Sequence, residues 1–523
     1  MATKKKSQKK NGNLPLCLIL GCVAVISALF CVVLGKLNVL PTRYYIAVCI
    51  LMAVILLVLF LLLRNFKGSF RCVLGVILTV IFCAGLCYGG FVMKRASDTL
   101  DKVSTSTTVT VSEINVYVRA DDAAQSVEDI AAYTLGIIDE QDRDITDKAL
   151  TQLASQLGTT LKVATFTSPV TLVRGLLDGQ VDAILMNSAF FSLVSSNESF
   201  ATLNTDLRQL TTLKVEVETT VVEEVSNDGD NTSDTSSSKH SKKTSKKSGN
   251  NAQGSSDADS EGSIFTVYIT GVDQYGDIST VGRGDVNILA VVNSDTHQVL
   301  LVSTPRDYYI PLANSNGNYD KLTHAAIYGV ENSMETLAML YDIDIDYYFR
   351  INFSGFEDVI DAIDGVTVNN DVSFSTYDGK YFSAGELYLN GPDALSYVRE
   401  RHAFPDGDFT RGRHQMMVIN AAAKKVLSPE ILVNFSDLMY AIEGNFETSI
   451  PSDMITSLVQ NQLSNGGDWN IVQYSVGGYN DWRTCWSYGD GLSVVTPYYE
   501  TVDIAMDLMQ DVIDGKTPVI PEN

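Results

Sequence analysis

The chain has 523 residues, enough for two or three domains, and its formal net charge is −24. In so acidic a chain, arginines that recur at the ends of predicted strands and helices indicate a specific role for positive charge. Seven of the eight cysteines lie within apolar runs near the N-terminus. The eighth, Cys485, stands alone in the rest of the chain, which excludes a scaffold held together by intrachain disulfides.

Three uncharged apolar runs open the chain, at residues 14–35, 44–63 and 72–93. Each is long enough to cross about 30 Å of hydrocarbon as a helix. A cleavable signal peptide would instead have one shorter apolar core followed by a cleavage site of small residues. We therefore expect three transmembrane helices within residues 14–93.

Basic residues set the expected orientation of these spans. The leader, residues 1–13, carries five lysines, and the loop between the second and third spans carries three basic residues. The positive-inside rule places both in the cytoplasm, so everything after about residue 94 is expected outside. A large exported region with one cysteine is typical of bacteria, so we expect a multi-pass protein of a bacterial cell membrane with an extracellular C-terminal region.

Residues 110–222 alternate short apolar strands with segments of helical period. This alternation predicts a small extracellular α/β accessory domain with a parallel sheet. The stretch "SPVTLVRGLLDGQVDAILMNSAFFSLV" faintly resembles the lobes of solute-binding proteins, but a structural or partner-contacting module is the favoured interpretation. The expected strands are 113–120, 131–139, 160–167 and 180–187, and the expected helices are 143–157 and 168–179.

A polar segment at residues 225–262 contains no large apolar side chain after its first residue, Val225. Such a stretch cannot bury enough surface to order itself, so it is interpreted as a disordered linker rich in Ser, Asn, Asp and Lys. Its lysines at 239–247 could touch an anionic wall or membrane surface, although a solvated linker is favoured. The expected outside location argues against nucleic acid as a partner.

Residues 263–515 form a second outer domain, predicted to be α/β or α+β in three layers. Its first strand ends at Asp273, and two further strands are joined at "NSDTH". Other segments show helical spacing or the two-residue alternation of a strand. The expected helices are 324–341, 355–365, 392–398, 410–427 and 498–513, with a strand at 345–354.

Charge concentrates at the ends of these elements. The places are the end of "YITGVD", the stretches "GRGD" and "TPRD", and the segment "YVRERHAFPDGDFTRGRHQ". Arg399 and Arg401 are two residues apart and face the same way only if "YVRER" leaves its helix in extended form. Arg411 and Gln415 are four apart and share one face of a helix, whose N-terminus also favours anions.

These residue types suit a phosphorylated ligand. Guanidinium groups bind phosphate oxygens through paired hydrogen bonds and stay charged at any relevant pH. Carboxylates beside them suit Mg²⁺, which shares its oxygen ligands with substrate phosphates. The combination suggests phosphoryl transfer by positioning and charge neutralisation. The alternative for any single Arg–Asp pair is a surface ion pair that stabilises the fold by only about 0–1 kcal/mol.

Seven motifs in order across residues 264–425 resemble the LytR–CpsA–Psr family of bacterial wall-polymer ligases. They are "GVDQYG", "GRGDVNILAVVN", "VLLVSTPRDYYI", "DKLTHAAIYG", "DYYFRINFSGFEDVIDAIDGVTV", "LNGPDALSYVRERH" and "GDFTRGRHQ". The resemblance implies a Mg²⁺-dependent phosphotransferase outside the membrane of a Gram-positive bacterium. It would move a glycopolymer from a polyprenyl-pyrophosphate carrier to peptidoglycan.

The resemblance also implies roles for single residues. Asp273 and Asp285 match the metal-binding carboxylates, and either would serve as the base. Arg306 and Arg399 match groups that lie around the pyrophosphate and are needed for catalysis. The remaining pyrophosphate-binding positions are Arg283, Arg401, Arg411 and Gln415, with Arg413 and Lys321 as further members.

The sequence departs from the family pattern in four places. "GRGD" replaces the common Arg-Ser-Asp form, and "STPRD" replaces Ser-Ile-Pro-Arg-Asp. The other two departures lie in one predicted helix. Met416 stands where many members have a second glutamine, and His414 stands where many have arginine. Three spans and an outer α/β domain ahead of the catalytic domain resemble the capsule-associated branch. This favours capsular polysaccharide over wall teichoic acid as the cargo.

Three rival functions remain open from the sequence. A polyprenyl-pyrophosphate pyrophosphatase would use water in place of the sugar acceptor. A membrane-bound regulator or sensor of envelope polysaccharide synthesis is a second class, although only a short leader precedes the first span. A wall-binding receptor that uses residues 110–222 for recognition is a third.

Overall fold

The computed structural model describes residues 14–37, 40–63, 70–104, 107–220, 263–272, 278–426, 438–441 and 444–521. The predicted leader and the linker at 225–262 lie outside the described residues. So does Asp273, one of the two predicted metal ligands.

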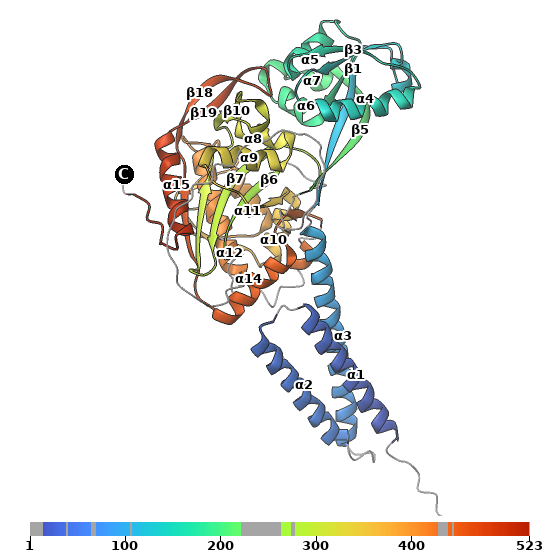
Figure 1. Ribbon diagram of the computed structural model, residues 1–523, viewed down its shortest axis with the longest axis vertical. Helices are drawn as coiled ribbons and strands as arrows, with labels where there is room; N and C mark the ends of the chain where they lie inside the picture. The colour runs from blue at the N-terminus through green and yellow to red at the C-terminus, as the bar shows by residue number, and fades with distance from the viewer. Residues whose placement is uncertain are drawn as a thin grey trace, which may run out of the picture.

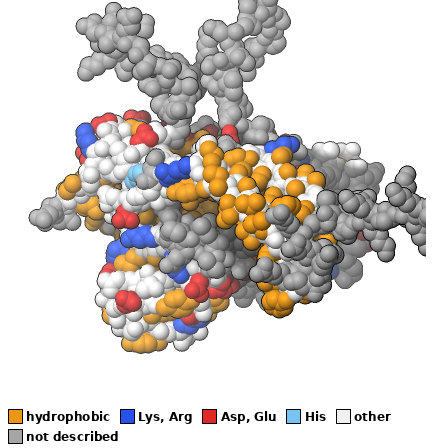
Figure 2. All heavy atoms as spheres, turned by 90° about the horizontal axis from the view of Figure 1, so that it is seen from below, with side chains coloured by type: hydrophobic (Ala, Val, Ile, Leu, Met, Phe, Trp, Pro, Cys, Tyr) orange, Lys and Arg blue, Asp and Glu red, His pale blue; other side chains and the backbone are white. Residues whose placement is uncertain are grey.

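Three helices project from the rest of the molecule: α1 (Leu14–Leu37), α2 (Thr42–Leu63) and α3 (Phe70–Val103). Each is long and apolar enough to cross a membrane, as predicted. Their apolar side chains are largely exposed, among them Leu29 at 60% and Leu57 at 57%. Figure 2, viewed from the end at which these helices project, shows hydrophobic side chains gathered in a broad field. Such a surface is stable only against hydrocarbon or another apolar partner.

The helix α3 does not stop at the end of its apolar run. It continues to Val103, and its last turns pack into the core of the C-terminal domain, where Ala96 and Val103 are buried with Ile360. At the start of α2, Arg43 donates hydrogen bonds to the backbone oxygens of Leu463, at 3.0 Å, and of Ser464. The C-terminal domain therefore contacts one end of the helical bundle at two separate points.

The accessory domain has a five-stranded sheet in the order β3-β2-β4-β1-β5. The strand β2 runs parallel to β3 and β4, but β1 runs antiparallel to both of its neighbours, β4 and β5, so the prediction of a parallel sheet is wrong for one strand, β1. The reason is that the chain enters along β1 and returns along β5 to the same end of the domain. Its elements are β1 (Thr107–Arg119), β2 (Thr134–Ile138), α4 (Arg143–Leu157), β3 (Lys162–Phe166), α5 (Pro169–Leu177), β4 (Ala183–Asn187), α6 (Ser188–Ser195), α7 (Leu203–Asp206) and β5 (Leu207–Thr220).

The C-terminal domain is built on a six-stranded mixed sheet in the order β16-β11-β6-β7-β8-β17. Successive side chains of its central strand point to opposite faces. Leu289 and Val291 pack against α9 and α15, whereas Ile288 and Ala290 pack toward α12 and α14. The strands are β6 (Ile264–Val272), β7 (Gly284–Asn293), β8 (Gln298–Ser303), β11 (Tyr347–Ile351), β16 (Phe446–Thr448) and β17 (Asn470–Ser475).

Helices on both faces of this sheet confirm the expected three layers. Four of the predicted helices are present as α10, α11, α12 and α15. The predicted helix at 324–341 is split, because Gly329 has a φ of 109°: α8 ends at Ala325, a short 3-10 turn follows, and α9 begins at Val330. Pro392 sits in the first turn of α11, where its missing N–H costs no hydrogen bond. The helices are α8 (Leu322–Ala325), α9 (Val330–Tyr341), α10 (Phe353–Ala362), α11 (Gly391–Arg399), α12 (Asp408–Val426), α14 (Ser452–Asn465) and α15 (Tyr499–Ile513).

Small antiparallel pairs complete this domain. They are β9 (Tyr309–Pro311) with β10 (Tyr319–Lys321), β12 (Val366–Asn370) with β15 (Gly385–Leu389), β13 (Phe374–Ser375) with β14 (Tyr381–Phe382), and β18 (Gly478–Cys485) with β19 (Asp490–Pro497). The hairpin β18–β19 lies on the side of the accessory domain, at the end of the molecule away from α1 and α2 (Figure 1).

Candidate active site

Two oppositely charged side chains meet where β7 begins and β8 has ended. The strands are antiparallel, with Ile288 opposite Ser303, so these two ends share one edge of the sheet. The Nη1 atom of Arg306 donates a hydrogen bond to Oδ1 of Asp285 at 2.8 Å. Arg306 and Asp285 are 21 residues apart in the sequence, and the register of the sheet brings them together.

A second carboxylate, Asp408, joins three arginines. Its oxygens lie 3.0 Å from Nη2 of Arg411, 3.8 Å from Nε of Arg306 and 3.8 Å from Nη1 of Arg401. Asp408 opens α12, where the helix dipole stabilises a negative charge. Sequence analysis missed Asp408 as a site residue. Its signal was an acidic residue three positions before Arg411 at a helix start.

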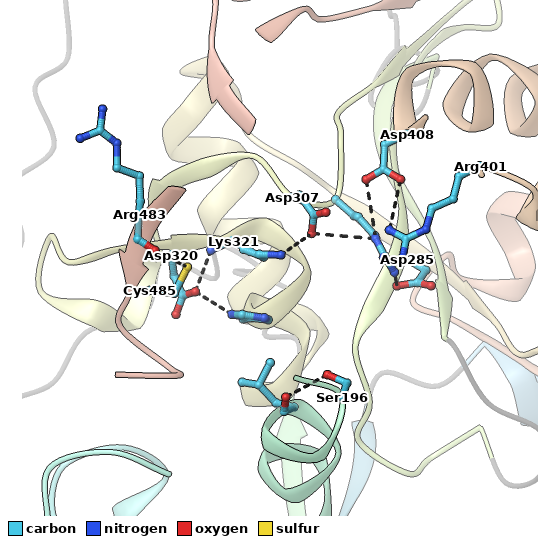
Figure 3. A network of polar contacts seen from close by, with 12 residues as sticks. Ser196, Asp285, Asp307, Asp320, Lys321, Arg401, Asp408, Arg483 and Cys485 are labelled. Carbon is cyan, nitrogen blue, oxygen red and sulfur yellow. Dashed lines mark hydrogen bonds and ion pairs between the residues drawn. The ribbon is translucent and has the colours of Figure 1, made fainter. Parts of the chain in front are cut away.

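The third carboxylate, Asp307, connects a lysine to the group. Its Oδ1 lies 3.2 Å from Nζ of Lys321 and 3.9 Å from Nε of Arg306. Figure 3 shows Asp307 between Lys321 and the carboxylates Asp285 and Asp408. We call these seven residues the charged cluster: Asp285, Arg306, Asp307, Lys321, Arg401, Asp408 and Arg411.

The charged cluster is mostly buried, and burial opposes charge on its members. The side chain of Arg306 is 13% exposed and that of Arg411 is 7% exposed. Burial tends to raise the pKa of Asp285, but the guanidinium groups of Arg306 and Arg411 outweigh it and hold that pKa below its usual range. Burial opposes the charge on Asp307 in the same way, and Lys321 and Arg306 lower its pKa. Both carboxylates are therefore ionised at neutral pH.

Two guanidinium groups respond to the cluster in opposite directions. Burial acts to lower the pKa of Arg306, but Asp285 and the other two carboxylates raise it above its ordinary value. Burial, followed by repulsion from Arg306, lowers the pKa of Arg411. The buried Nε of Arg306 has no hydrogen-bond partner among the described residues. A buried donor of this kind is suited to an anionic oxygen from a ligand.

On one side of the charged cluster lies an apolar cavity of about 840 Å³. Arg399, the last residue of α11, lies with its guanidinium 4.2 Å from the centre of the Phe353 ring. Glu400 then takes an extended conformation, as predicted, and Arg399 and Arg401 line the same cavity. The apolar lining includes Ile269, Val286, Phe349, Ile351, Phe353, Phe356, Val359, Ile360, Leu395, Val398, Val418, Ile419, Ala422 and Val426.

On the other side lies a polar cleft of about 1,060 Å³. It is lined by Arg283, Lys321 and Asp307, and its far wall is formed by the accessory domain and the hairpin β18–β19. Arg306, Arg401 and His402 line both the cleft and the apolar cavity. The charged cluster therefore lies at the junction between the two spaces.

The sequence-predicted site residues divide into four sets, of which the last is Arg413 alone. Asp285, Arg306, Lys321, Arg401 and Arg411 belong to the charged cluster, and Arg283, Arg399 and Gln415 line one of the two adjoining spaces. Arg411 and Gln415 line the same cavity, as their spacing predicts. Asp273 lies outside the described residues.

The structure does not bring Arg413 into the cluster, so its predicted place among the pyrophosphate-binding groups is not supported. Its guanidinium pairs with Asp406 at 3.1 Å and bonds Thr410, and it lines neither space. Its neighbours on α12 also point elsewhere. His414 stacks on Tyr397 with ring centres 4.3 Å apart, and Met416 packs in the core beside the sheet. These two departures, both on α12, therefore lie away from the charged cluster.

A divalent cation fits this donor set only with help from a ligand. Among the described residues, no group of three or more His, Cys, Asp or Glu side chains could hold a metal. Mg²⁺ is commonly bound by one or two carboxylates together with substrate phosphates and water. Asp285 suits such a site because it is ionised and lines the apolar cavity at the cluster. Val272, the last described residue of β6, pairs with Gly284, next to Asp285.

Comparison with known proteins shows to which family the chain belongs. The model of the LytR–CpsA–Psr family matches residues 221–496, which is more than half of the chain. The chain belongs to this family. The resemblance seen in the sequence motifs is thereby confirmed, while assignment to the capsule-associated branch stays a prediction.

Relatives in this family include two Bacillus proteins described as polyisoprenyl-teichoic acid–peptidoglycan teichoic acid transferase TagU. The Bacillus cereus protein is 35% identical over 210 residues, covering 39% of this chain and 68% of that protein. The Bacillus subtilis protein is 37% identical over 191 residues, covering 36% of this chain and 61% of that protein. The crystal structure of B. subtilis TagV matches with a TM-score of 0.42 and 26% identity, over 49% of this chain and all of that one.

Proposed function

We propose that this family member is a membrane-anchored phosphotransferase that moves a wall glycopolymer from a polyprenyl-pyrophosphate carrier to peptidoglycan. The printed activity of the TagU relatives supports this reaction class. One observation carries the proposal for this chain: the charged cluster lies between an apolar cavity and a polar cleft and borders both.

This arrangement fits an amphiphile with an anionic middle. A polyprenyl tail would bury its methyl and methylene groups in the apolar cavity, at roughly 25 cal/mol for each Å² removed from water. The pyrophosphate would lie against Arg306, Arg401 and Arg411, which supply paired donors. The glycan would then extend into the polar cleft. A ligand without a lipid tail would leave the apolar cavity empty.

The reaction forms one bond and breaks one. The oxygen of the acceptor hydroxyl bonds to the phosphorus that carries the glycan, and the bond from that phosphorus to the bridging oxygen breaks. Polyprenyl phosphate leaves with the electron pair, and the hydroxyl proton passes to water. Phosphoryl transfer asks the protein mainly for positioning and charge stabilisation, which buried arginines provide. Because Asp285 is ionised and bonded to Arg306, we assign it to orienting that arginine in place of acting as the base.

We further propose Mg²⁺ at Asp285, with Asp273 as the second ligand that the family resemblance implies. The ion would neutralise charge on the pyrophosphate when bound. Asp285 then has two tasks in this chain, because one oxygen accepts from Arg306 while the carboxylate also lines the cavity that the lipid headgroup would enter.

The membrane arrangement supports the predicted orientation, with the N-terminus in the cytoplasm and this domain outside. Arg43, before the apolar run of α2, and the last turns of α3 both contact the C-terminal domain. The start of α2 and the domain therefore share one side of the bundle, opposite the end of α2 and the start of α3. Capsular polysaccharide stays our proposed cargo, with teichoic acid as the alternative.

A reconstituted transfer assay tests the proposed function. The full chain in lipid nanodiscs would receive lipid-linked glycopolymer, with or without peptidoglycan. We expect glycan attached to peptidoglycan through a phosphodiester, and no turnover without the acceptor. Equal release of glycan phosphate in both samples would instead identify a pyrophosphatase. Absence of any lipid turnover would contradict the proposal.

A further inference from the structure

We propose that the accessory domain forms, with the hairpin β18–β19, a carbohydrate-binding wall of the polar cleft. This inference rests on the proposed function, which places the reaction at the charged cluster at the base of the cleft. The accessory-domain part of this wall is Arg174, Ser196, Asn197, Glu198, Ser199 and Phe200. The site would hold a glycan chain next to the charged cluster, so the accessory domain would help to select the carbohydrate substrate.

The accessory domain is held firmly enough to serve as a wall. Phe190 of α6 packs edge-on against Tyr328, and Tyr328 stacks on Trp486 with ring centres 5.5 Å apart. Nε2 of Gln141 donates to the backbone oxygen of Trp486 at 2.6 Å. Apolar side chains of both domains, including Tyr488, belong to one buried cluster. A continuous core of this kind fixes the distance across the cleft.

The same domain also braces the segment that carries Arg283. The backbone N–H of Val111, in β1, donates to the oxygen of Ser279 at 3.0 Å, and the N–H of Val281 donates to the oxygen of Val111 at 3.2 Å. Arg283 follows two residues later and lines the cleft. The accessory domain therefore contributes to the position of one predicted pyrophosphate-binding residue as well as to the far wall.

The chemistry of the far wall fits sugars. Trp482 is 67% exposed and lies over Gly491, where an added Cβ would collide with its ring nitrogen. An exposed aromatic face of this kind packs against the C–H face of a sugar ring. The cleft is also lined by amide and hydroxyl groups, which donate to and accept from sugar hydroxyls, and by a carboxylate, which accepts from them. They are Ser196, Asn197, Glu198, Ser199, Asn480 and Ser493.

One ion pair spans the two parts of the wall. Nη2 of Arg174 lies 3.6 Å from Asp490 of the hairpin, and its guanidinium lies 5.7 Å from the centre of the Phe200 ring. Figure 3 shows Ser196, on the accessory domain, below the part of the C-terminal domain that carries Lys321 and Asp307; its hydroxyl donates to the backbone oxygen of Leu193 at 2.9 Å.

Binding measurements on the full chain in nanodiscs test this site. The carbohydrate could come from the acceptor or the donor, so two probes are needed. One is peptidoglycan glycan strands without lipid, and the other is lipid-linked glycopolymer compared with bare polyprenyl pyrophosphate. Trp482→Ala and Arg174→Ala should weaken binding of at least one carbohydrate probe about fivefold or more. Binding of bare polyprenyl pyrophosphate should not change.

Matched controls separate the cleft from general effects. Tyr381→Ala removes an aromatic ring that is also 67% exposed but lines neither space, and Arg143→Ala removes a surface arginine of α4. Loss of strand binding in the cleft variants assigns the wall to the acceptor, and loss of glycopolymer binding alone assigns it to the donor. Unchanged binding of both probes would overturn the inference. Failure of the wild-type chain to bind bare polyprenyl pyrophosphate would contradict the proposed function instead.

Discussion

Arg306 is the residue on which the charged cluster converges, because it lies within ion-pair distance of three carboxylates. Its hydrogen bond to Asp285 fixes one side of the guanidinium, while its Nε keeps a donor without a partner among the described residues. Arginine suits this position better than lysine because its donors lie in one plane and match two oxygens at once.

Replacing Arg306 should therefore remove activity more than stability. We expect Arg306→Lys to lower the rate of glycan transfer by about 10²–10³, the usual cost of losing one preorganised donor to developing charge. The charge is kept, so the variant should stay folded. Transfer rate and thermal unfolding would be measured together.

Arg413 provides the matched control, because it lies on α12 but pairs with Asp406 away from the cluster. Its exposed ion pair should contribute only about 0–1 kcal/mol, and Arg413→Lys should transfer at close to the wild-type rate. Similar losses in the two variants would remove the distinction drawn here between cluster and surface arginines.

Low pH should lower the free energy of unfolding by protonating the carboxylates of the charged cluster. Cluster cations lower the pKa of Asp285 and of Asp307 in the folded protein, whereas an unfolded aspartate titrates near about 3.9. Below that value the unfolded state binds more protons, so the free energy of unfolding falls as pH decreases. Above it the stabilisation is fully present. We expect the melting temperature of the wild-type chain to decrease as the pH is lowered below about 4. The decrease from the value at pH 7 should be smaller in Asp285→Asn. Parallel profiles would contradict the assigned ion pair.

At the scale of elements, α12 divides its faces between ligand and core. Arg411, Gln415, Val418 and Ala422 recur at helical spacing and line the apolar cavity. His414 and Met416 lie on other faces, against aromatic rings and the sheet. One helix thus supplies both the charged end and part of the apolar wall of the same space.

A larger side chain on this face should shorten the space for a lipid tail. We expect Ala422→Phe to weaken binding of long-chain polyprenyl pyrophosphate at least tenfold, because the tail would have to leave apolar contacts worth about 0.8 kcal/mol for each methylene group. Binding of a short-chain analogue should change little. Lys424→Phe, at an exposed position of α12, is the control, and equal losses for both chain lengths would argue against a tail in this cavity.

Much of this arrangement could be predicted from local sequence. Apolar alternation located β6, β7, β8 and β11, and helical spacing located α12 with Arg411 and Gln415 on one face. The pairing of Asp408 with Arg411 had a local signal, but its contact with Arg306, about a hundred positions earlier, could not be predicted from local sequence. The polar cleft could not be predicted either, because it is lined by residues of two domains whose packing against each other has no local sequence signal.

At the scale of the whole molecule, α3 links the apolar bundle to the domain that holds the charged cluster. It is one helix from Phe70 to Val103, and its end packs beside α10, whose residues also line the apolar cavity. The accessory domain lies at the other end of the molecule (Figure 1). The apolar cavity therefore lies near the membrane-side attachment, and the polar cleft lies toward the accessory domain.

Breaking α3 between the bundle and the domain should leave the domain folded and active but reduce its access to lipid within the membrane. Asp98 is an exposed position of this helix, and proline there removes a backbone hydrogen bond and kinks the helix. We expect Asp98→Pro to keep transfer from detergent-dissolved donor but to lose most transfer from donor within the same nanodisc, whereas Asp98→Ala should keep both. Equal activity of Asp98→Pro in both settings would show that a rigid α3 is not needed.

The central claim is that one lipid-linked pyrophosphate occupies the apolar cavity and the charged cluster together. Native mass spectrometry of the full chain purified from a bacterial membrane measures this directly. We predict a bound polyprenyl phosphate or pyrophosphate that is depleted in Ala422→Phe and in Arg306→Lys and retained in Lys424→Phe and Arg413→Lys. Equal lipid occupancy in all four variants, or no polyprenyl lipid on the wild-type chain even after its addition, would contradict the account.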